Sequence, residues 1–201
     1  MRDPIDEGRR RLLLRSVSAT GLIGVASAAY PFIRSWEPSA RAKALGAPVD
    51  VDIAALEPGA IVSVIWRGRL VYVVRRPAAL VAGLGALAPE LVDPDSGVSE
   101  QPPYARNEYR SRIPEYLVVE GVCTHLQCAP RGALSGPSPR PDIVKAWPGG
   151  FFCSCHGSVY DASGRVFKGV PAPKNLPIPP YYFASATRLV IGLDAPPPER
   201  I

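Results

Sequence analysis

Two short stretches of this chain hold all of its cysteines and histidines. The chain has 201 residues, of which four are cysteine and two are histidine. All six lie in CTHLQC, residues 123–128, and in FCSCHGSVY, residues 152–160, and 24 residues separate Cys128 from Cys153. Thiolate and imidazole are preferred ligands of zinc, copper and iron, and cysteine also forms disulfides. The clustering predicts that the two boxes meet in space around a metal centre, a disulfide or both.

The residues of the two boxes fit three interpretations. A structural zinc site takes four ligands, more often in Cys-x-x-Cys or His-x(3–5)-His pairs, and leaves two cysteines unexplained. A disulfide framework is typical of an exported chain but gives the histidines no role. In the third interpretation four residues bind metal and two form a disulfide, the ligands being Cys123, His125, Cys153 and His156 and the disulfide Cys128–Cys155. The residues alone leave these interpretations open.

The body of the chain has the composition of a β protein. Glycine and proline together make 42 residues (18 and 24), which favours strands, turns and loops over a helical bundle. Short runs rich in β-branched and aromatic residues predict antiparallel strands within 49–56, 60–76, 116–121 and 176–193. Arg67-Gly68 is expected to be a hairpin turn. Residues 77–87 predict a short helix, and residues 90–114 a long surface insertion.

The N-terminal part predicts a membrane anchor followed by a linker. Residues 16–33 carry no charge over 18 positions, which reaches the length needed to span a bilayer. A cleaved signal peptide is the alternative, but the apolar stretch continues past its small-residue site to an interfacial Trp36. Residues 37–49 are rich in small residues, Gly and Pro, and are expected to form a flexible linker. More arginines precede the apolar stretch (Arg2, Arg9, Arg10, Arg11, Arg15) than basic residues follow it (Arg34, Arg41, Lys43), which predicts a cytoplasmic N-terminus.

The charge of the chain argues against a nucleic-acid partner. The net charge is +5 and the pI about 9.2. A nucleic-acid-binding face needs clustered Lys and Arg with aromatic platforms. Here the basic residues are spread out, apart from the N-terminal group. Within that group, RRRLLL at residues 9–14 resembles a twin-arginine export signal.

The two boxes closely resemble those of the Rieske iron–sulfur proteins, Cys-Thr-His-Leu-Gly-Cys and Cys-Pro-Cys-His-Gly-Ser. CSCHGSVYDASGRVFKGVPAPKNLPIP, residues 153–179, is similar to that family's cluster-binding tail and proline loop. With the anchor and linker, the resemblance covers most of the chain and points to the Rieske subunits of bacterial cytochrome bc complexes. Gln127 and Ser154 depart from the family pattern, where Gly and Pro are common.

The resemblance implies a fold, a cofactor and roles for residues. The fold is mainly β: an antiparallel Rieske-type β-sandwich with a small cluster-binding subdomain, about residues 117–174, and one N-terminal transmembrane helix. The cofactor is a [2Fe-2S] cluster, whose two imidazole ligands raise the reduction potential above that of an all-thiolate cluster. The implied site residues are the metal ligands Cys123, His125, Cys153 and His156; the disulfide Cys128–Cys155; the hydrogen-bond donors Ser158 and Tyr160; the apolar cover Leu126; and the lid loop with Gly169, Pro171 and Pro173.

The same resemblance implies an electron-transfer subunit of quinol–cytochrome c oxidoreductase, which contributes to proton translocation. Its expected partners are ubiquinol at cytochrome b, a c-type cytochrome and membrane lipid, within a dimeric complex. The expected organisation is a cytoplasmic N-terminus (1–15), an anchor (16–36), a hinge (37–48) and a periplasmic Rieske domain (49–201). His156, and also His125, are the expected quinol-facing residues. Two alternatives remain at this point, the Rieske subunit of another exported oxidoreductase such as arsenite oxidase, and a non-redox zinc-stabilised binding module.

Overall fold

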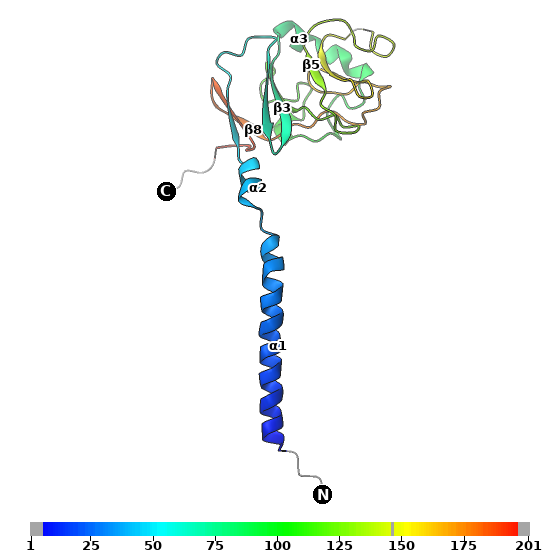
Figure 1. Cartoon of the computed structure of the whole chain (residues 1–201). Helices are drawn as coiled ribbons and strands as arrows, with labels where there is room; N and C mark the ends of the chain where they lie inside the picture. Colours follow the sequence, from blue (N-terminus) through cyan, green and yellow to red (C-terminus); the bar gives the residue numbers. More distant parts are fainter. Residues whose placement is uncertain (1–5, 146, 197–201) are drawn as a thin grey trace. The chain divides into compact units, whose positions relative to one another are not determined.

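The computed structural model describes residues 6–145 and 147–196 (Figure 1). The chain divides into two compact units that meet between Ala44 and Leu45, and each is described by itself. The predicted cytoplasmic segment lies in part outside the described residues, since residues 1–5, with Arg2, are not described. The same holds for the C-terminal residues 197–201 of the predicted Rieske domain.

The first unit consists mainly of one long helix, α1 (Glu7–Ser35). Asp6 caps its N-terminus by accepting a hydrogen bond from the Arg9 amide at 3.1 Å. None of its residues is buried in the protein, although its middle is apolar. Among the described residues it is the one helix long and apolar enough to cross a membrane. The helix begins nine residues before the predicted anchor, because the arginine-rich segment that precedes the apolar stretch is part of the same helix.

The expected flexible linker contains a stretch of regular structure. A short helix, α2 (Ala40–Leu45), interrupts it, and the Ser39 hydroxyl accepts a hydrogen bond from the Ala42 amide in its first turn. Four of the six α2 residues are alanine or leucine, which have high helix propensity. Residues 40–45 of the expected flexible linker are therefore helical, where the sequence had indicated no regular structure.

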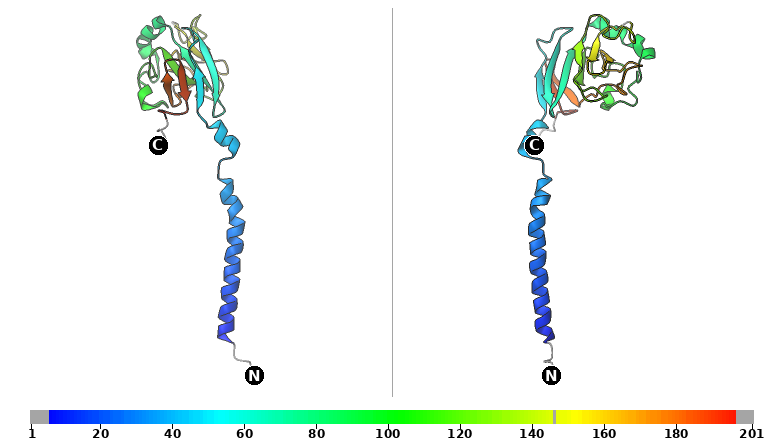
Figure 2. Two further views of the ribbon diagram at one scale, coloured as in Figure 1. Left: turned by 90° about the vertical axis from the view of Figure 1, so that its left-hand side faces the viewer. Right: turned by 45° about the vertical axis from the view of Figure 1, so that its right-hand side comes forward.

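The described residues of the second unit form three antiparallel sheets of three strands each (Figure 2). The first has the order β1 (Val49–Asp52), β9 (Arg188–Ile191), β8 (Tyr181–Ser185); the second β2 (Ile61–Trp66), β3 (Arg69–Arg75), β4 (Tyr116–Glu120); the third β5 (Arg131–Ala133), β6 (Gly150–Cys153), β7 (Ser158–Asp161). Every pairing is antiparallel. This confirms the predicted fold class, a mainly antiparallel β domain with one N-terminal apolar helix.

The β2–β3 hairpin, cyan in Figure 2, turns at the predicted dipeptide. Arg67 and Gly68 have φ values of 52° and 73°, the left-handed geometry of a type I′ turn, and Trp66 pairs with Arg69 across it. The main core lies between the sheets and includes Val71, Val73, Leu117, Phe151 and Tyr160.

The predicted helix at residues 77–87 is present only in part. It forms α3 (Ala78–Gly83) and then changes into a 3₁₀ segment, η1 (Gly85–Glu90). Two glycines lie at the break, and Pro89 within η1 has no amide hydrogen to donate.

Residues 90–114, with the short 3₁₀ segment η2 (Pro103–Ala105), are not simply a surface insertion. Ser96, Ala105 and Arg110 are fully buried. The Arg110 guanidinium donates hydrogen bonds to the Ser163, Gly164 and Leu176 carbonyls. Burial lowers the pKa of Arg110 to about 9. The insertion therefore packs against the turn that follows β7 and fixes it.

Candidate metal centre

Both boxes are short loops closed in the same way. In the first, which follows β4, the Gln127 amide donates to the Cys123 carbonyl at 2.9 Å. In the second, between β6 and β7, the Gly157 amide donates to the Cys153 carbonyl at 2.9 Å. Gln127 and Gly157 both have left-handed φ values, 63° and 76°. At the position where the family commonly has glycine, Gln127 thus holds a left-handed conformation that glycine adopts more easily.

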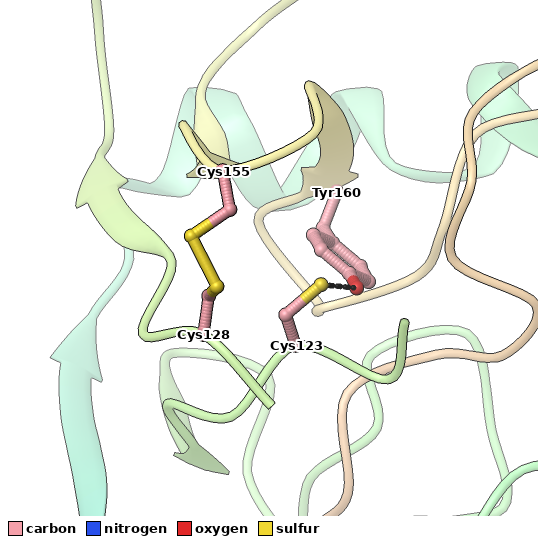
Figure 3. Close-up of a disulfide and its surroundings, with 4 residues drawn as sticks. All are labelled: Cys123, Cys128, Cys155 and Tyr160. Atoms are coloured by element: carbon pink, nitrogen blue, oxygen red, sulfur yellow. Dashed lines mark hydrogen bonds between the residues drawn. A yellow bond between two sulfur atoms is a disulfide. The ribbon is translucent and has the colours of Figure 1, made fainter. Parts of the chain in front are cut away.

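A disulfide joins Cys128 of the first box to Cys155 of the second (Figure 3). The two Cα atoms are 6.7 Å apart, within the usual range for a disulfide, and 27 positions separate the cysteines along the chain. The bridge holds the two box loops next to each other, as the sequence predicted.

The four remaining cysteine and histidine side chains divide into a buried pair and an outer pair. Cys123 and Cys153 are free thiols and are each 1% exposed. His125 is half-buried and His156 exposed, and their ring centroids are 4.7 Å apart at 89°. Burial, with the neighbouring Cys123 thiol, raises the pKa of Cys153. The arrangement offers two inner sulfur donors and two outer nitrogen donors.

A second set of sulfur atoms lies close together but is a poor metal site. The Sγ atoms of Cys128, Cys153 and Cys155 lie within 4.8 Å of one another. Two of them share the disulfide, and a metal is bound by thiolate. The donor set available to a metal is therefore that of the two thiols and two imidazoles.

The Tyr160 hydroxyl lies at the base of the site. It is 3.3 Å from the Cys123 sulfur, a contact drawn in Figure 3, and it accepts a hydrogen bond from the Thr124 amide at 3.3 Å. Burial, and secondly the Cys123 contact, raise the pKa of Tyr160 well above its usual value. Tyr160 therefore keeps its hydroxyl proton, which it can donate to sulfur.

The expected lid loop is attached to both boxes. Ala172, which is buried, donates its amide hydrogen to the Ser158 hydroxyl at 3.1 Å. Thr124 of the first box donates its hydroxyl to the Lys174 carbonyl at 2.7 Å. Gly169 has a φ of +77°, and Pro171 is exposed. The loop is thus fixed against each box by one hydrogen bond.

The other predicted residues are also at this end of the second unit. Pro173 is exposed, Ser158 is fully buried, and Leu126 at the tip of the first box is 63% exposed. Leu126 is therefore a surface side chain in this structure.

Two contributors were not identified from the sequence. One is Thr124, described above. The other is Asn175, which accepts from the Val166 amide and donates to the Asp93 carbonyl and the Ser96 hydroxyl. Asn175 lies just after the proline loop, but its burial is not visible in the sequence, so no signal in the sequence identified it.

Comparison with known proteins gives a consistent result. The family model "Rieske [2Fe-2S] domain" matches residues 108–180. The ubiquinol–cytochrome c reductase iron–sulfur subunit of Allochromatium vinosum is 48% identical over 191 residues, which cover 94% of this chain and 91% of the relative. This chain belongs to the ubiquinol–cytochrome c reductase iron–sulfur subunits. The iron–sulfur subunit of Blastochloris viridis is 42% identical over 94% of this chain and 96% of its own length. Among solved structures, a chain of a hyperthermophilic respiratory Complex III is 25% identical with a TM-score of 0.46, covering 87% of this chain and 96% of that one.

Membership of this family establishes an electron-transfer role and a Rieske [2Fe-2S] cofactor. The donors at the site fit that cofactor, since a Rieske cluster takes two thiolates and two imidazoles. The arsenite oxidase-like alternative and the zinc-stabilised binding module are not favoured. The helix α1 fits a single-pass anchor of a respiratory complex.

Proposed function

We propose that Cys123, Cys153, His125 and His156 hold the [2Fe-2S] cluster, and that the exposed His156 faces the quinol. The observation that carries this proposal is the pairing of two buried thiols with two imidazole rings 4.7 Å apart, on loops joined by a disulfide. The buried sulfurs place one side of the site inside the protein. The outer rings leave the other side open to a partner.

When bound, the cluster accepts and releases one electron at a time. The imidazole of His156 is exposed, so a ring nitrogen can accept a hydrogen bond from a quinol hydroxyl. The same nitrogen then holds the proton that leaves the quinol as the electron is transferred. His125, half-buried against His156, limits the directions from which a quinol can approach.

The neighbouring residues position the site. The Tyr160 hydroxyl, 3.3 Å from the Cys123 sulfur, can donate its hydrogen to it, and Ser158 is free to donate its own, since its oxygen accepts from the Ala172 amide. Both donors favour the more negative, reduced state and raise the reduction potential. The lid loop from Gly169 to Pro173 shields one side of the site from water. Leu126, exposed at the tip of the first box, is the proposed apolar cover of the cluster.

The proposed partners are those of a cytochrome bc complex. Cytochrome b supplies the quinol pocket and a c-type cytochrome takes the electron, within a dimeric complex embedded in membrane lipid. The proposed organisation is a cytoplasmic N-terminus, an anchor at residues 16–36, a hinge at 37–48 and a periplasmic head from residue 49. The arginine excess before the apolar segment supports this orientation.

The test is the paramagnetic spectrum of the reduced, purified full-length protein, with its iron and zinc content. We expect two irons per chain and a Rieske-type signal, which Ala substitutions of Cys123, His125, Cys153 or His156 each abolish. The matched control is Tyr104→Phe, whose hydroxyl bonds the Tyr181 backbone and no residue of either box, and which is expected to keep the signal. Zinc in place of iron would refute the proposal. A full signal in one of the Ala variants would show that the substituted residue is not a ligand.

A further inference from the structure

The 24 residues between Cys128 and Cys153 are not an inert spacer. The part that runs from β5 to β6 is anchored by Val144 and Trp147, both buried in a small second core. The Trp147 indole donates a hydrogen bond to the Tyr160 carbonyl at 3.1 Å. On the other side, a Cβ at Gly169 would lie 3.5 Å from Ile143 Cγ2. This segment therefore contacts both the strand that carries Tyr160 and the lid loop.

The same segment places a charged pair beside the second box. Arg140 Nε and Nη2 donate to both carboxylate oxygens of Asp142, at 2.6 to 3.1 Å. A Cβ at Gly157 would lie only 2.5 Å from Arg140 Nη1, so the guanidinium lies against the bare backbone of that glycine. Gly157 directly follows His156. Among the described residues Nη1 has no hydrogen-bond partner of its own.

Both members of the pair are charged at neutral pH. The hydrogen bond to Asp142 raises the pKa of Arg140, and the Arg140 guanidinium keeps the pKa of Asp142 below its usual value. The side chains are 32% and 60% exposed, so solvent and salt screen their field in part. The guanidinium is the nearer charge to Gly157, because Asp142 bonds the Nε–Nη2 edge and Nη1 meets the glycine.

We propose that Arg140 tunes the electron-transfer site electrostatically. Its positive charge at Gly157 raises the reduction potential of the cluster, and the negative charge of Asp142 offsets part of that effect. The inference rests on the proposed role of His156 as a cluster ligand. A positive charge next to the cluster stabilises its reduced state, which carries one more negative charge. The side-chain-free Gly157 is what allows the guanidinium to approach so closely.

The test uses two single substitutions that should act in opposite directions. Arg140→Gln leaves the Asp142 carboxylate unpaired, and we expect a lower midpoint potential. Asp142→Asn leaves the guanidinium uncompensated, and we expect a higher one. The double variant should return close to the unmodified value. All are measured on the full-length protein at pH 7 by redox titration of the paramagnetic signal.

The chain offers a matched control in Arg188 and Asp50. They form a similar exposed pair between β9 and β1, with Arg188 Nη2 2.6 Å from the carboxylate, outside the boxes and the lid loop. Arg188→Gln and Asp50→Asn should leave the potential unchanged. High salt should reduce the two Arg140–Asp142 shifts, since it screens exposed charges.

Shifts of the same sign in the two single variants would overturn the inference, because a merely structural role disturbs the loop in either case. Two unchanged potentials would overturn it as well. These outcomes are distinct from failure of the proposed function, in which the unmodified protein shows no Rieske signal at all.

Discussion

Removing one oxygen atom at the base of the site should measurably lower the reduction potential of the cluster. In Tyr160→Phe the ring stays in the core, where Tyr160 is fully buried, and only the hydroxyl is lost. The hydroxyl contacts the Cys123 sulfur at 3.3 Å and the Thr124 amide at 3.3 Å. The substitution therefore removes the hydroxyl that is proposed to donate to the sulfur of Cys123, and leaves the Thr124 amide without this acceptor.

The size of the effect follows from the charge on sulfur. A hydrogen bond to a charged acceptor contributes about 1.5–3 kcal/mol, and only the part that differs between the two oxidation states changes the potential. If that part is about 1 kcal/mol, the potential falls by about 40 mV, since about 1.4 kcal/mol corresponds to about 59 mV for one electron. Redox titration of the paramagnetic signal measures it, with Tyr104→Phe as the control. An unchanged potential with an intact cluster would show that the hydroxyl hydrogen is directed away from Cys123, for example to the Thr124 hydroxyl at 3.4 Å.

Three further predictions concern stability. Gln127→Gly should raise the melting temperature. A residue with a side chain loses roughly 1–2 kcal/mol of folding free energy in the left-handed conformation, and the greater entropy loss of glycine on folding offsets about half of that gain. No rise would mean that Gln127 makes compensating contacts. Cys128→Ser with Cys155→Ser removes a cross-link worth about 3 kcal/mol, so the signal should decay faster in air and the potential should fall, whereas ready alkylation of both thiols in the unmodified native protein would show that the bridge does not form. Burial would raise the pKa of Asp93, but hydrogen bonds from Ser99, Gly97 and Val98 outweigh it and lower that pKa, so its stabilisation is complete above the unfolded value of 3.8 and lost as pH falls below it. Asp93→Asn should lower thermal stability at pH 7 and flatten its acid dependence, and an acid dependence identical to that of the unmodified protein would refute this role.

The site was more predictable than the surrounding fold because its information is local. The spacing of Cys123, His125 and Cys128 within one box is visible along the chain, and the family resemblance supplied the pairing of Cys128 with Cys155. The hairpin at Arg67-Gly68 was predictable for the same reason, since a type I′ turn needs two adjacent residues that tolerate positive φ.

What the sequence did not reveal depends on contacts between distant segments. The polar stretch that contains Ser96 and Arg110 resembles a solvated loop. The Arg110 guanidinium, however, donates to the Leu176 carbonyl, and the Ser96 hydroxyl accepts from the Asn175 side-chain amide, both more than 50 positions away. The helix at residues 40–45 was also missed, because the nearby Gly and Pro favoured a flexible linker over the helix propensity of its alanines and leucine. The place of Arg140 beside Gly157 follows only from the way the inter-box segment folds back.

The hydrogen bonds of the lid loop have a consequence for biogenesis. Thr124 and Lys174 lie 50 positions apart, Ser158 and Ala172 lie 14 apart, and the disulfide spans 27. Such non-local contacts form late, after the strands that bring their ends together. The two box loops and the lid loop are therefore expected to be among the last parts of the chain to fold. We therefore expect iron that is delivered before these contacts form to meet separate thiols, and the cluster to be inserted after most of the second unit has folded.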